Sequence, residues 1–184
     1  MKNQVTSHKS QVTSHKSSRA SGTNCIAVFI FLSIFVLSYS SSYAAQPLAK
    51  NVSEAAPDFK LLNLSGQQIS LSGFRGKPVI LFIWTTWCPF CRAELVDLQG
   101  RYKGMKQEGI ELLAVDTGET KEKVEKFLAN KNMEFPVLLD SASGVANAYN
   151  IIGVPTLVLI DSQGKIRFQG NELPGNYIQI LTRK

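Results

Sequence analysis

Two cysteines stand in the pattern Cys-Pro-Phe-Cys, at Cys88 and Cys91. An apolar, β-branched run at 79–83 precedes them, and apolar residues at three- and four-residue steps follow them, which predicts a strand that leads into a helix. Pro89 suits the first turn of that helix, where its missing N–H would have had no partner. Cys88 then lies at the positive helix end, which favours a thiolate, and Cys91 lies one turn later on the same side. The spacing predicts a pair that exchanges disulfides, with Cys88 as the exposed nucleophile and Cys91 as its shielded partner.

Other uses of the cysteine pair fit the chain less well. A structural zinc site needs about four ligands, but the histidines, His8 and His15, both lie near the N-terminus. A purely structural disulfide would close a very short loop, which restricts the unfolded chain little. The third cysteine, Cys25, lies before the expected folded domain. We therefore expect redox chemistry that uses the Cys88–Cys91 pair as a redox-active disulfide, with no metal and no cofactor.

The segment 84–95, Trp-Thr-Thr-Trp-Cys-Pro-Phe-Cys-Arg-Ala-Glu-Leu, resembles the active-site segment of thioredoxin-like proteins of the TlpA/ResA type. Ala-Pro-Asp-Phe at 56–59, Gly-Phe-Arg-Gly-Lys-Pro at 73–78 and Gly-Val-Pro-Thr at 153–156 match the same family in the same order. These proteins are extracytoplasmic thiol–disulfide oxidoreductases, related to the reductases that serve cytochrome c maturation. The resemblance implies a thioredoxin fold and the reduction of disulfides in exported polypeptides, with electrons supplied by a membrane donor.

The resemblance also implies a surface for the substrate. Val154 and Pro155 match the family's cis-proline loop, which lies opposite the cysteines and lends backbone groups to a bound strand. Trp87, Pro89 and Phe90 would extend this loop into an apolar rim around Cys88 that docks a polypeptide. Trp84 lies on the preceding strand, where packing in the core is the expected role.

Attack by Cys91 needs a proton acceptor, and the expected domain has no histidine. Glu94 is the candidate, because three residues place it one helical turn beyond Cys91, and it matches an active-site glutamate of the TlpA/ResA pattern. An ordinary surface glutamate in the first helical turn is the alternative. Phe82 occupies the position where thioredoxins proper carry a buried aspartate, so that pattern offers no second acceptor.

Two other functions fit parts of the same pattern. Thr85 stands three residues before Cys88, the Thr-x-x-Cys spacing of peroxiredoxins, which share the Ala-Pro-Asp-Phe segment. A peroxiredoxin-like peroxidase would use Cys88 to reduce peroxide. A non-enzymatic thioredoxin-like module could instead bind Cu(I) through Cys88 and Cys91, although the copper chaperones of this kind add a histidine. The tryptophans and the Cys-Pro-Phe-Cys pattern favour the disulfide exchanger.

Residues 1–44 have the pattern of a leader. A polar seven-residue repeat, 4–10 and 11–17, precedes a thirteen-residue apolar run at 25–37, shorter than the roughly twenty residues that span a bilayer. A basic region, a short apolar core and small residues ending at Ala44 are typical of a secretory signal peptide. An uncleaved signal anchor and an organellar transit peptide are the alternatives. We expect a periplasmic or secreted protein, attached to the membrane only if this segment is retained.

Most of the net charge of +6 belongs to the leader. Without the four basic residues Lys2, Lys9, Lys16 and Arg19, sixteen basic residues face fourteen acidic ones. No basic stripe is left to bind nucleic acid. The expected partners are disulfide-containing polypeptides.

After a linker at 45–55, residues 56–184 have the pattern of one thioredoxin-like domain. A hairpin around Ser65-Gly66 opens it. Strands are expected at 79–84, 110–116, 135–139, 156–160 and 165–169, and helices at 91–106, 120–131, 140–149 and 177–184. This order predicts an α/β thioredoxin fold: a mixed central sheet with helices on both faces and an added N-terminal hairpin. The pairs Glu119/Lys123 and Glu122/Lys126 have the four-residue spacing of a solvated helix face.

Overall fold

The computed structural model describes residues 54–183. The expected leader, its repeat, Cys25 and nearly all of the linker lie outside the described residues. Within 54–183, no helix has the length and apolar character needed to cross a bilayer.

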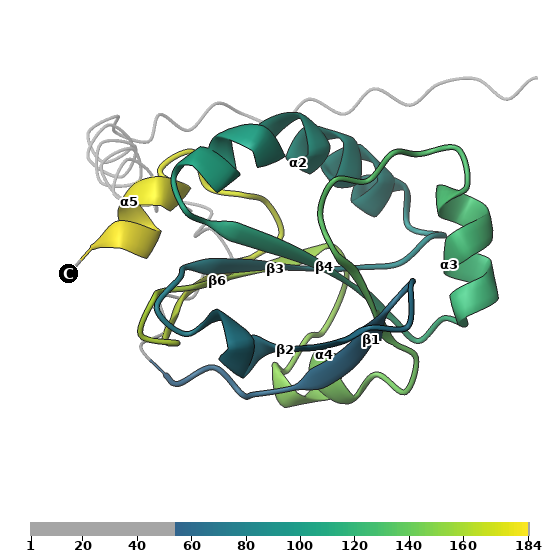
Figure 1. Ribbon diagram of the computed structural model, residues 1–184, viewed down its shortest axis with the longest axis horizontal. Coiled ribbons are helices and arrows are strands. Elements are labelled where there is room, and N and C mark those ends of the chain that lie inside the picture. Colours follow the sequence, from purple (N-terminus) through teal and green to yellow (C-terminus); the bar gives the residue numbers. More distant parts are fainter. Residues whose placement is uncertain (1–53, 184) are drawn as a thin grey trace, which may run out of the picture. The chain divides into compact units, whose positions relative to one another are not determined.

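A mixed seven-stranded sheet in the order β2-β1-β5-β4-β3-β6-β7 forms the centre of the domain (Figure 1). The strands are β1 (Lys60–Asn63), β2 (Gln68–Ser70), β3 (Val79–Trp84), β4 (Glu111–Thr117), β5 (Val137–Asp140), β6 (Thr156–Ile160) and β7 (Ile166–Gly170). β3, β4 and β5 pair in parallel, whereas β6 and β7 form an antiparallel hairpin beside β3. The hairpin of β1 and β2 extends the other edge through β5. This is the predicted thioredoxin fold with its added N-terminal hairpin.

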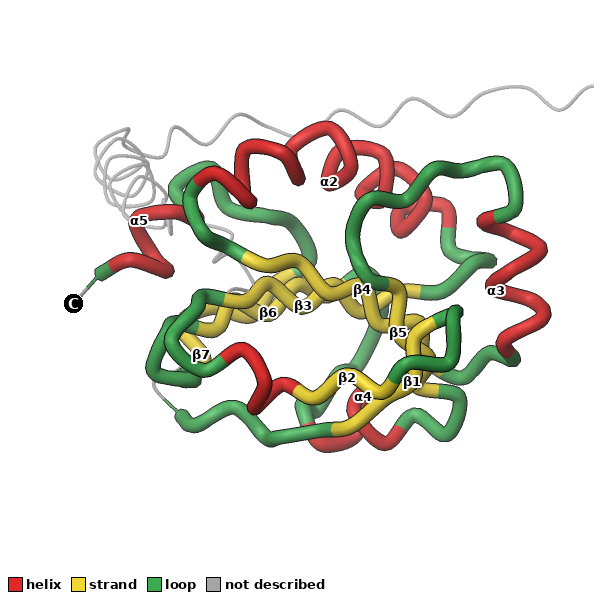
Figure 2. The backbone as a smooth tube through the Cα atoms, viewed as in Figure 1, coloured by secondary structure: helices red, strands yellow, loops and turns green. Residues whose placement is uncertain are grey.

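Helices cover both faces of the sheet, as Figure 2 shows for the layers above and below the yellow strands. The helices are η1 (Leu71–Phe74), α2 (Pro89–Gln107), α3 (Lys121–Leu128), α4 (Gly144–Ala148) and α5 (Tyr177–Thr182). α2, α3 and α5 pack against one face, while α4 and η1 pack against the other. Burial on both faces explains why all six residues of β3 are apolar and buried.

The long helix α2 buries the face that its sequence periodicity predicts. Its buried residues are Cys91, Leu95, Leu98, Tyr102 and Met105. The helix begins two residues earlier than expected because Pro89 is its first residue. α3 ends at Leu128, three residues short of the expected boundary. α4 begins at Gly144, four residues later than expected, and the Asp140 carboxylate stabilises its start by accepting hydrogen bonds from the backbone N–H groups of Val145 and Ala146.

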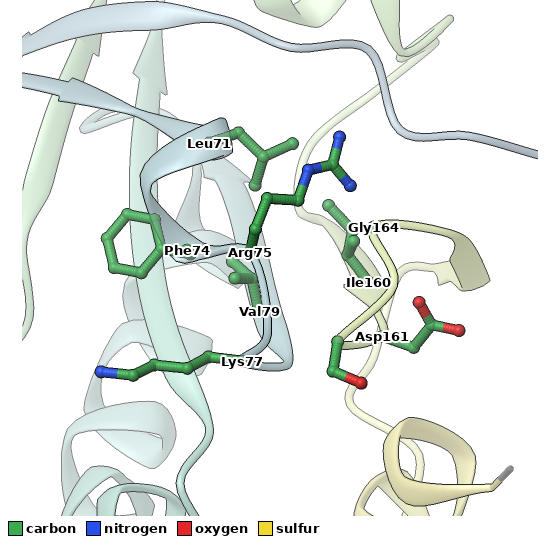
Figure 3. Close-up of a pocket in the computed structure, with 9 residues that line it drawn as sticks. Leu71, Phe74, Arg75, Lys77, Val79, Ile160, Asp161 and Gly164 are labelled. Atoms are coloured by element: carbon green, nitrogen blue, oxygen red, sulfur yellow. The ribbon is translucent and has the colours of Figure 1, made fainter.

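The Gly-Phe-Arg-Gly-Lys-Pro segment contacts the turn between β6 and β7 (Figure 3). Because Ile160 at the end of β6 pairs with Val79 at the start of β3, this turn lies at the sheet end away from the cysteines, which follow the other end of β3. Arg75 reaches toward this turn and its Nη1 donates a hydrogen bond to the carbonyl oxygen of Gln163 at 3.0 Å. The backbone N–H of Gly76 donates to the carbonyl oxygen of Ser162 at 3.0 Å. Gly164 completes the turn with φ of +77°, the conformation that the predicted hairpin turn requires. The matched segment therefore anchors the fold and lies outside the catalytic region.

Candidate active site

Cys88 is the N-cap residue of α2. Its Sγ accepts a hydrogen bond from the backbone N–H of Cys91 at 3.4 Å, and Pro89 follows as the first helical residue. Both cysteines are unbonded in the structure. The sulfur of Cys88 therefore lies at the helix start, where the helix end favours negative charge.

The Cys88 side chain is covered, which corrects one expectation. Cys88 is 4% exposed and Cys91 is 0% exposed, so the prediction of an exposed Cys88 is wrong for this dithiol form. The Cys88 thiol donates a hydrogen bond to the carbonyl oxygen of Val154 at 3.6 Å. The loop that carries Val154 lies against the helix start, a long-range contact that no local pattern encodes.

The Val154–Pro155 peptide bond is cis, as the family resemblance implies. These two residues and Phe90 form the apolar part of a groove of about 510 Å³. Glu94, Asp97 and Glu172 add carboxylates to the same groove. The sequence-predicted residues Phe90, Glu94, Val154 and Pro155 therefore come together in space, although two helix positions and a distant loop supply them.

Two exposed aromatic side chains lie close to Cys88 in the chain. Trp87 is 60% exposed and Phe90 is 76% exposed. Pro89, between the cysteines, is also exposed. Trp84 is fully buried and its ring lies 6.2 Å from that of Phe82, nearly parallel to it, so it packs in the core as expected.

The Glu94 carboxyl group lies partly buried in the groove. Its Oε1 has no hydrogen-bond partner among residues 54–183. Burial raises the pKa of this carboxyl, and the charges of Asp97 and Glu172 add to the effect while Arg101 opposes it. Within the described part of the chain, no hydrogen bond joins Glu94 to Cys91.

Burial also raises the pKa of the Cys91 thiol far above its ordinary value, and a hydrogen bond and charge from Cys88 act in the same direction. Cys91 is therefore a thiol at neutral pH. It must lose its proton to another group before or while it attacks a disulfide.

Glu119 is a site residue that the sequence reasoning missed. The prediction of a solvated face is wrong for this residue, because Glu119 is 5% exposed. Its two carboxylate oxygens accept hydrogen bonds from the backbone N–H and the hydroxyl of Thr86, two residues before Cys88. A signal existed: Glu119 follows the carboxyl end of a buried parallel strand, where functional side chains of α/β folds gather.

The charge pairs of α3 follow the predicted spacing only in part. Lys123 Nζ lies 2.6 Å from Glu119 Oε1, which forms one predicted pair. The second predicted pair, Glu122 with Lys126, is absent from the ion pairs of residues 54–183. Lys121 and Glu125 pair instead at 3.5 Å, because the helix starts at Lys121 and these side chains lie one turn apart.

Two residues that a peroxiredoxin-like site would use have other environments here. The Thr85 hydroxyl is buried and makes no hydrogen bond to any described residue. Arg92 donates from Nε to the carbonyl oxygen of Thr86 at 2.7 Å, and its guanidinium lies over the Phe127 ring. Arg92 therefore links the active-site loop to Phe127 of α3 and is not among the residues that line the groove.

A model of the AhpC/TSA family matches residues 52–169, which is most of the chain. The chain belongs to the AhpC/TSA family. Among its curated relatives, the thiol-disulfide oxidoreductase ResA of Geobacillus kaustophilus is 36% identical over 140 residues, covering 76% of this chain and 80% of the relative. With this relationship and the Cys88–Cys91 pair at a helix start, the protein is a thiol–disulfide oxidoreductase of the ResA type.

Solved structures agree with this placement. The thioredoxin domain of a thiol-disulfide oxidoreductase from Bacteroides vulgatus matches with a TM-score of 0.61 and 29% identity, covering 69% of this chain and 91% of that one. A secreted disulfide oxidoreductase of Mycobacterium tuberculosis, described as homologous to E. coli DsbE, has the same fold. That match has a TM-score of 0.59 at 24% identity, covering 67% of this chain and 96% of that one. Thiol–disulfide interchange proteins of this type act on disulfide-containing substrates.

Proposed function

We propose that this protein reduces disulfides of exported polypeptides by dithiol exchange at Cys88 and Cys91. The observation that carries the proposal is the position of Cys88, whose Sγ accepts the Cys91 N–H and meets the Val154 carbonyl of the cis-proline loop. One sulfur is thus placed both at an activating helix end and beside a loop that can receive a substrate strand.

In the first step, the Cys88 thiolate attacks one sulfur of the client disulfide. A bond forms between this sulfur and Cys88 Sγ, the client disulfide bond breaks, and the other client sulfur leaves as a thiolate that takes up a proton. When Cys88 ionises it keeps the N–H donor of Cys91 but loses its bond to Val154. The Val154 carbonyl oxygen then becomes available to an N–H group of the client.

In the second step, Cys91 resolves the mixed disulfide. Its thiol gives up a proton while its sulfur bonds to Cys88 Sγ, and the client's second sulfur leaves as a thiolate. The client gains two electrons and two protons, and Cys88 and Cys91 become a disulfide. Glu94 accepts the Cys91 proton directly or through one water, a role supported by its raised pKa and its uncompensated carboxyl oxygen in the groove.

The groove beside Cys88 receives the client polypeptide. Phe90 and Trp87 supply exposed aromatic surface, and Val154 and Pro155 supply the loop against which the strand lies. Pro89 keeps the turn between the cysteines rigid. Apolar contact of this kind suits a polypeptide segment around a disulfide better than a small peroxide molecule.

Each turnover leaves Cys88 and Cys91 oxidised, so a donor of two electrons must restore them. A membrane electron donor fits a protein that acts outside the cytoplasm, and a role of the cytochrome c maturation type fits the ResA relatives. Export is supported by the basic and apolar leader pattern of residues 1–44 and by the secreted M. tuberculosis protein of the same fold. Membrane attachment follows only if that segment is retained.

The test combines an insulin-disulfide reduction assay with the reduction potential of the Cys88–Cys91 pair. A reductase is expected to reduce insulin and to have a potential near that of thioredoxin, about −270 mV. Cys88→Ser is the matched inactive control. A potential near that of a strong periplasmic oxidant, about −120 mV, would overturn the reducing direction. Stoichiometric peroxide consumption or tight Cu(I) binding without insulin reduction would support the other two functions instead.

A further inference from the structure

The carboxyl end of β4 carries a buried acid that the exchange mechanism does not use. Asp116 is 0% exposed, and neither of its carboxylate oxygens has a hydrogen-bond partner among the described residues. It pairs with Trp84 in the parallel register of β3 and β4, so it lies on the sheet level where the active-site loop begins. An ionised carboxylate in such surroundings would be very unfavourable without a compensating group.

Glu119 connects this buried acid to the active-site loop. Its carboxylate accepts hydrogen bonds from the Thr86 N–H and, at 2.9 Å, from the Thr86 hydroxyl. Lys123 of α3 donates to the same carboxylate at 2.6 Å. Thr86 is followed directly by Trp87 and Cys88, so the Glu119 carboxylate fixes the backbone that delivers Cys88 to the helix start.

The two carboxyl groups have opposite tendencies to ionise. Burial raises the pKa of Asp116 to about 8, and the neighbouring carboxyl groups of Glu119 and of Asp140 in β5 add to the rise, while Lys123 opposes it. Burial alone would also raise the pKa of Glu119, but Lys123, Thr86 and the neighbouring Asp116 carboxyl together hold it below its ordinary value. At neutral pH the pair therefore holds one proton, on Asp116, and one negative charge, on Glu119.

We propose that Asp116 and Glu119 are positioning residues for disulfide exchange: a buried carboxyl pair that shares one proton and holds Thr86, and through it Cys88, in place. The protonated Asp116 carboxyl neighbours the Glu119 carboxylate, which accepts hydrogen bonds from Thr86. When the shared proton is lost, two negative charges face one cation, Lys123, in a buried site, and the carboxylates move apart. The hold on Thr86 then weakens, so exchange depends on a group that is neither a thiol nor part of the groove.

The inference rests on the proposed exchange function, but its first test does not. The full chain carrying Cys88→Ser and Cys91→Ser has no titrating thiol at the site, so the NMR signal of the Thr86 amide reports the carboxyl pair alone. We expect this signal to shift with pH around a midpoint of about 8. Adding Asp116→Asn, whose amide keeps an N–H donor at every pH, is expected to abolish the shift.

Two further variants make this test specific. Glu119→Gln removes the neighbouring charge, so the Asp116 midpoint is expected to fall by at least one pH unit; if Asp116→Asn does not fold, Glu119→Gln carries the same test. Glu125→Gln removes an exposed carboxylate of α3 and is expected to leave the Thr86 titration unchanged. Two results would contradict a proton shared by Asp116 and Glu119. One is a Thr86 amide signal that does not change near pH 8, and the other is a midpoint that stays the same in Glu119→Gln.

The second test follows exchange in the chain with both cysteines. One pH unit above the Asp116 midpoint, only about a tenth of the molecules keep the proton. The rate ratio of Asp116→Asn to the unsubstituted protein is therefore expected to rise up to about tenfold between pH 7 and that point, while Glu125→Gln gives a constant ratio. If the exchange rates of Asp116→Asn and of the unsubstituted protein depend on pH in the same way, while the Thr86 signal still titrates near pH 8, the positioning role is overturned. If no form of the chain exchanges disulfides at any pH, the proposed function fails instead.

Discussion

The Cys88 thiol donates a hydrogen bond to the carbonyl oxygen of Val154 at 3.6 Å, although the two residues lie 66 positions apart in the chain. On its other side the same sulfur accepts the Cys91 N–H at 3.4 Å. Ionisation of Cys88 keeps the second contact and ends the first, because a thiolate has no proton to donate. We therefore expect activation of the nucleophile also to free the Val154 carbonyl as a backbone acceptor for a client strand.

Replacing Cys91 with serine should trap the client. The Cys88 thiolate still attacks a client disulfide, but no second thiol lies one helical turn away to resolve the mixed disulfide. We expect a covalent adduct of one client molecule per chain, seen by mass measurement under non-reducing conditions. Cys88→Ser should form no adduct. An equal yield of adduct from Cys88→Ser would show that Cys91 is the attacking thiol.

The sequence predicts most of the fold because its strands and helices are locally consistent. The apolar run of β3 and the periodic face of α2 act over short distances, and both form as expected. The burial of Cys88 and the role of Glu119 were not predictable in this way. Both depend on contacts with residues 66 and 33 positions away, and at four-residue spacing a buried acid looks the same as a solvated one.

Replacing Glu94 with glutamine should slow the resolving step. The amide cannot accept the Cys91 proton, so we expect resolution at neutral pH to slow by on the order of 10²-fold. Burial raises the Glu94 pKa above its ordinary value of 4.5, so the rate in the unsubstituted protein should fall as pH drops through that raised pKa. The rate of Glu94→Gln should lack this fall. The difference between the two should shrink at high pH, where hydroxide removes the Cys91 proton.

Single-turnover release of a client from the mixed disulfide measures this step. Asp97→Asn is the matched control, since Asp97 lines the same groove but forms an ion pair with Arg101 at 2.9 Å. If Glu94→Gln and Asp97→Asn release the client at equal rates, water alone accepts the Cys91 proton.

Replacing Phe90 with alanine should weaken client binding without unfolding the domain. The side chain is 76% exposed, so the free energy of unfolding should change by less than about 0.5 kcal/mol. We expect alanine to remove roughly half of the area that Phe90 buries against the client, which is worth about 1 kcal/mol of binding free energy. KM should therefore rise about fivefold with little effect on kcat. Val96→Ala is the control, because Val96 is 70% exposed on the same helix but does not line the groove. A fall in kcat with unchanged KM would place Phe90 in the chemical step instead.

Replacing Asp116 with asparagine should change how stability depends on pH. The Asp116 pKa is about 8 in the folded protein against an ordinary value of 3.8, so the folded state binds the proton more tightly than the unfolded state does. The stability contributed by this proton is complete below about pH 4 and is lost as pH rises through about 8. The free energy of unfolding of Asp116→Asn should therefore fall less steeply across this window. Parallel curves from urea unfolding at several pH values would contradict the raised pKa.

Gly164→Ala tests the anchor between Arg75 and the turn of β6 and β7. A Cβ at Gly164 would collide with Arg75 Nη1, so the guanidinium must leave its bond to Gln163, and the φ of +77° is unfavourable for alanine. We expect a loss of about 2 kcal/mol, of which roughly half comes from the backbone conformation. When Arg75 is already alanine, Gly164→Ala should cost only the backbone part. Urea unfolding of the unsubstituted protein, the two single variants and the double variant measures this difference as a coupling free energy. If Gly164→Ala lowers the free energy of unfolding equally with and without Arg75, the Arg75 side chain moves away from the new Cβ at no cost in stability. Disulfide exchange should be unchanged in all four, because the turn lies at the end of β6 opposite Pro155.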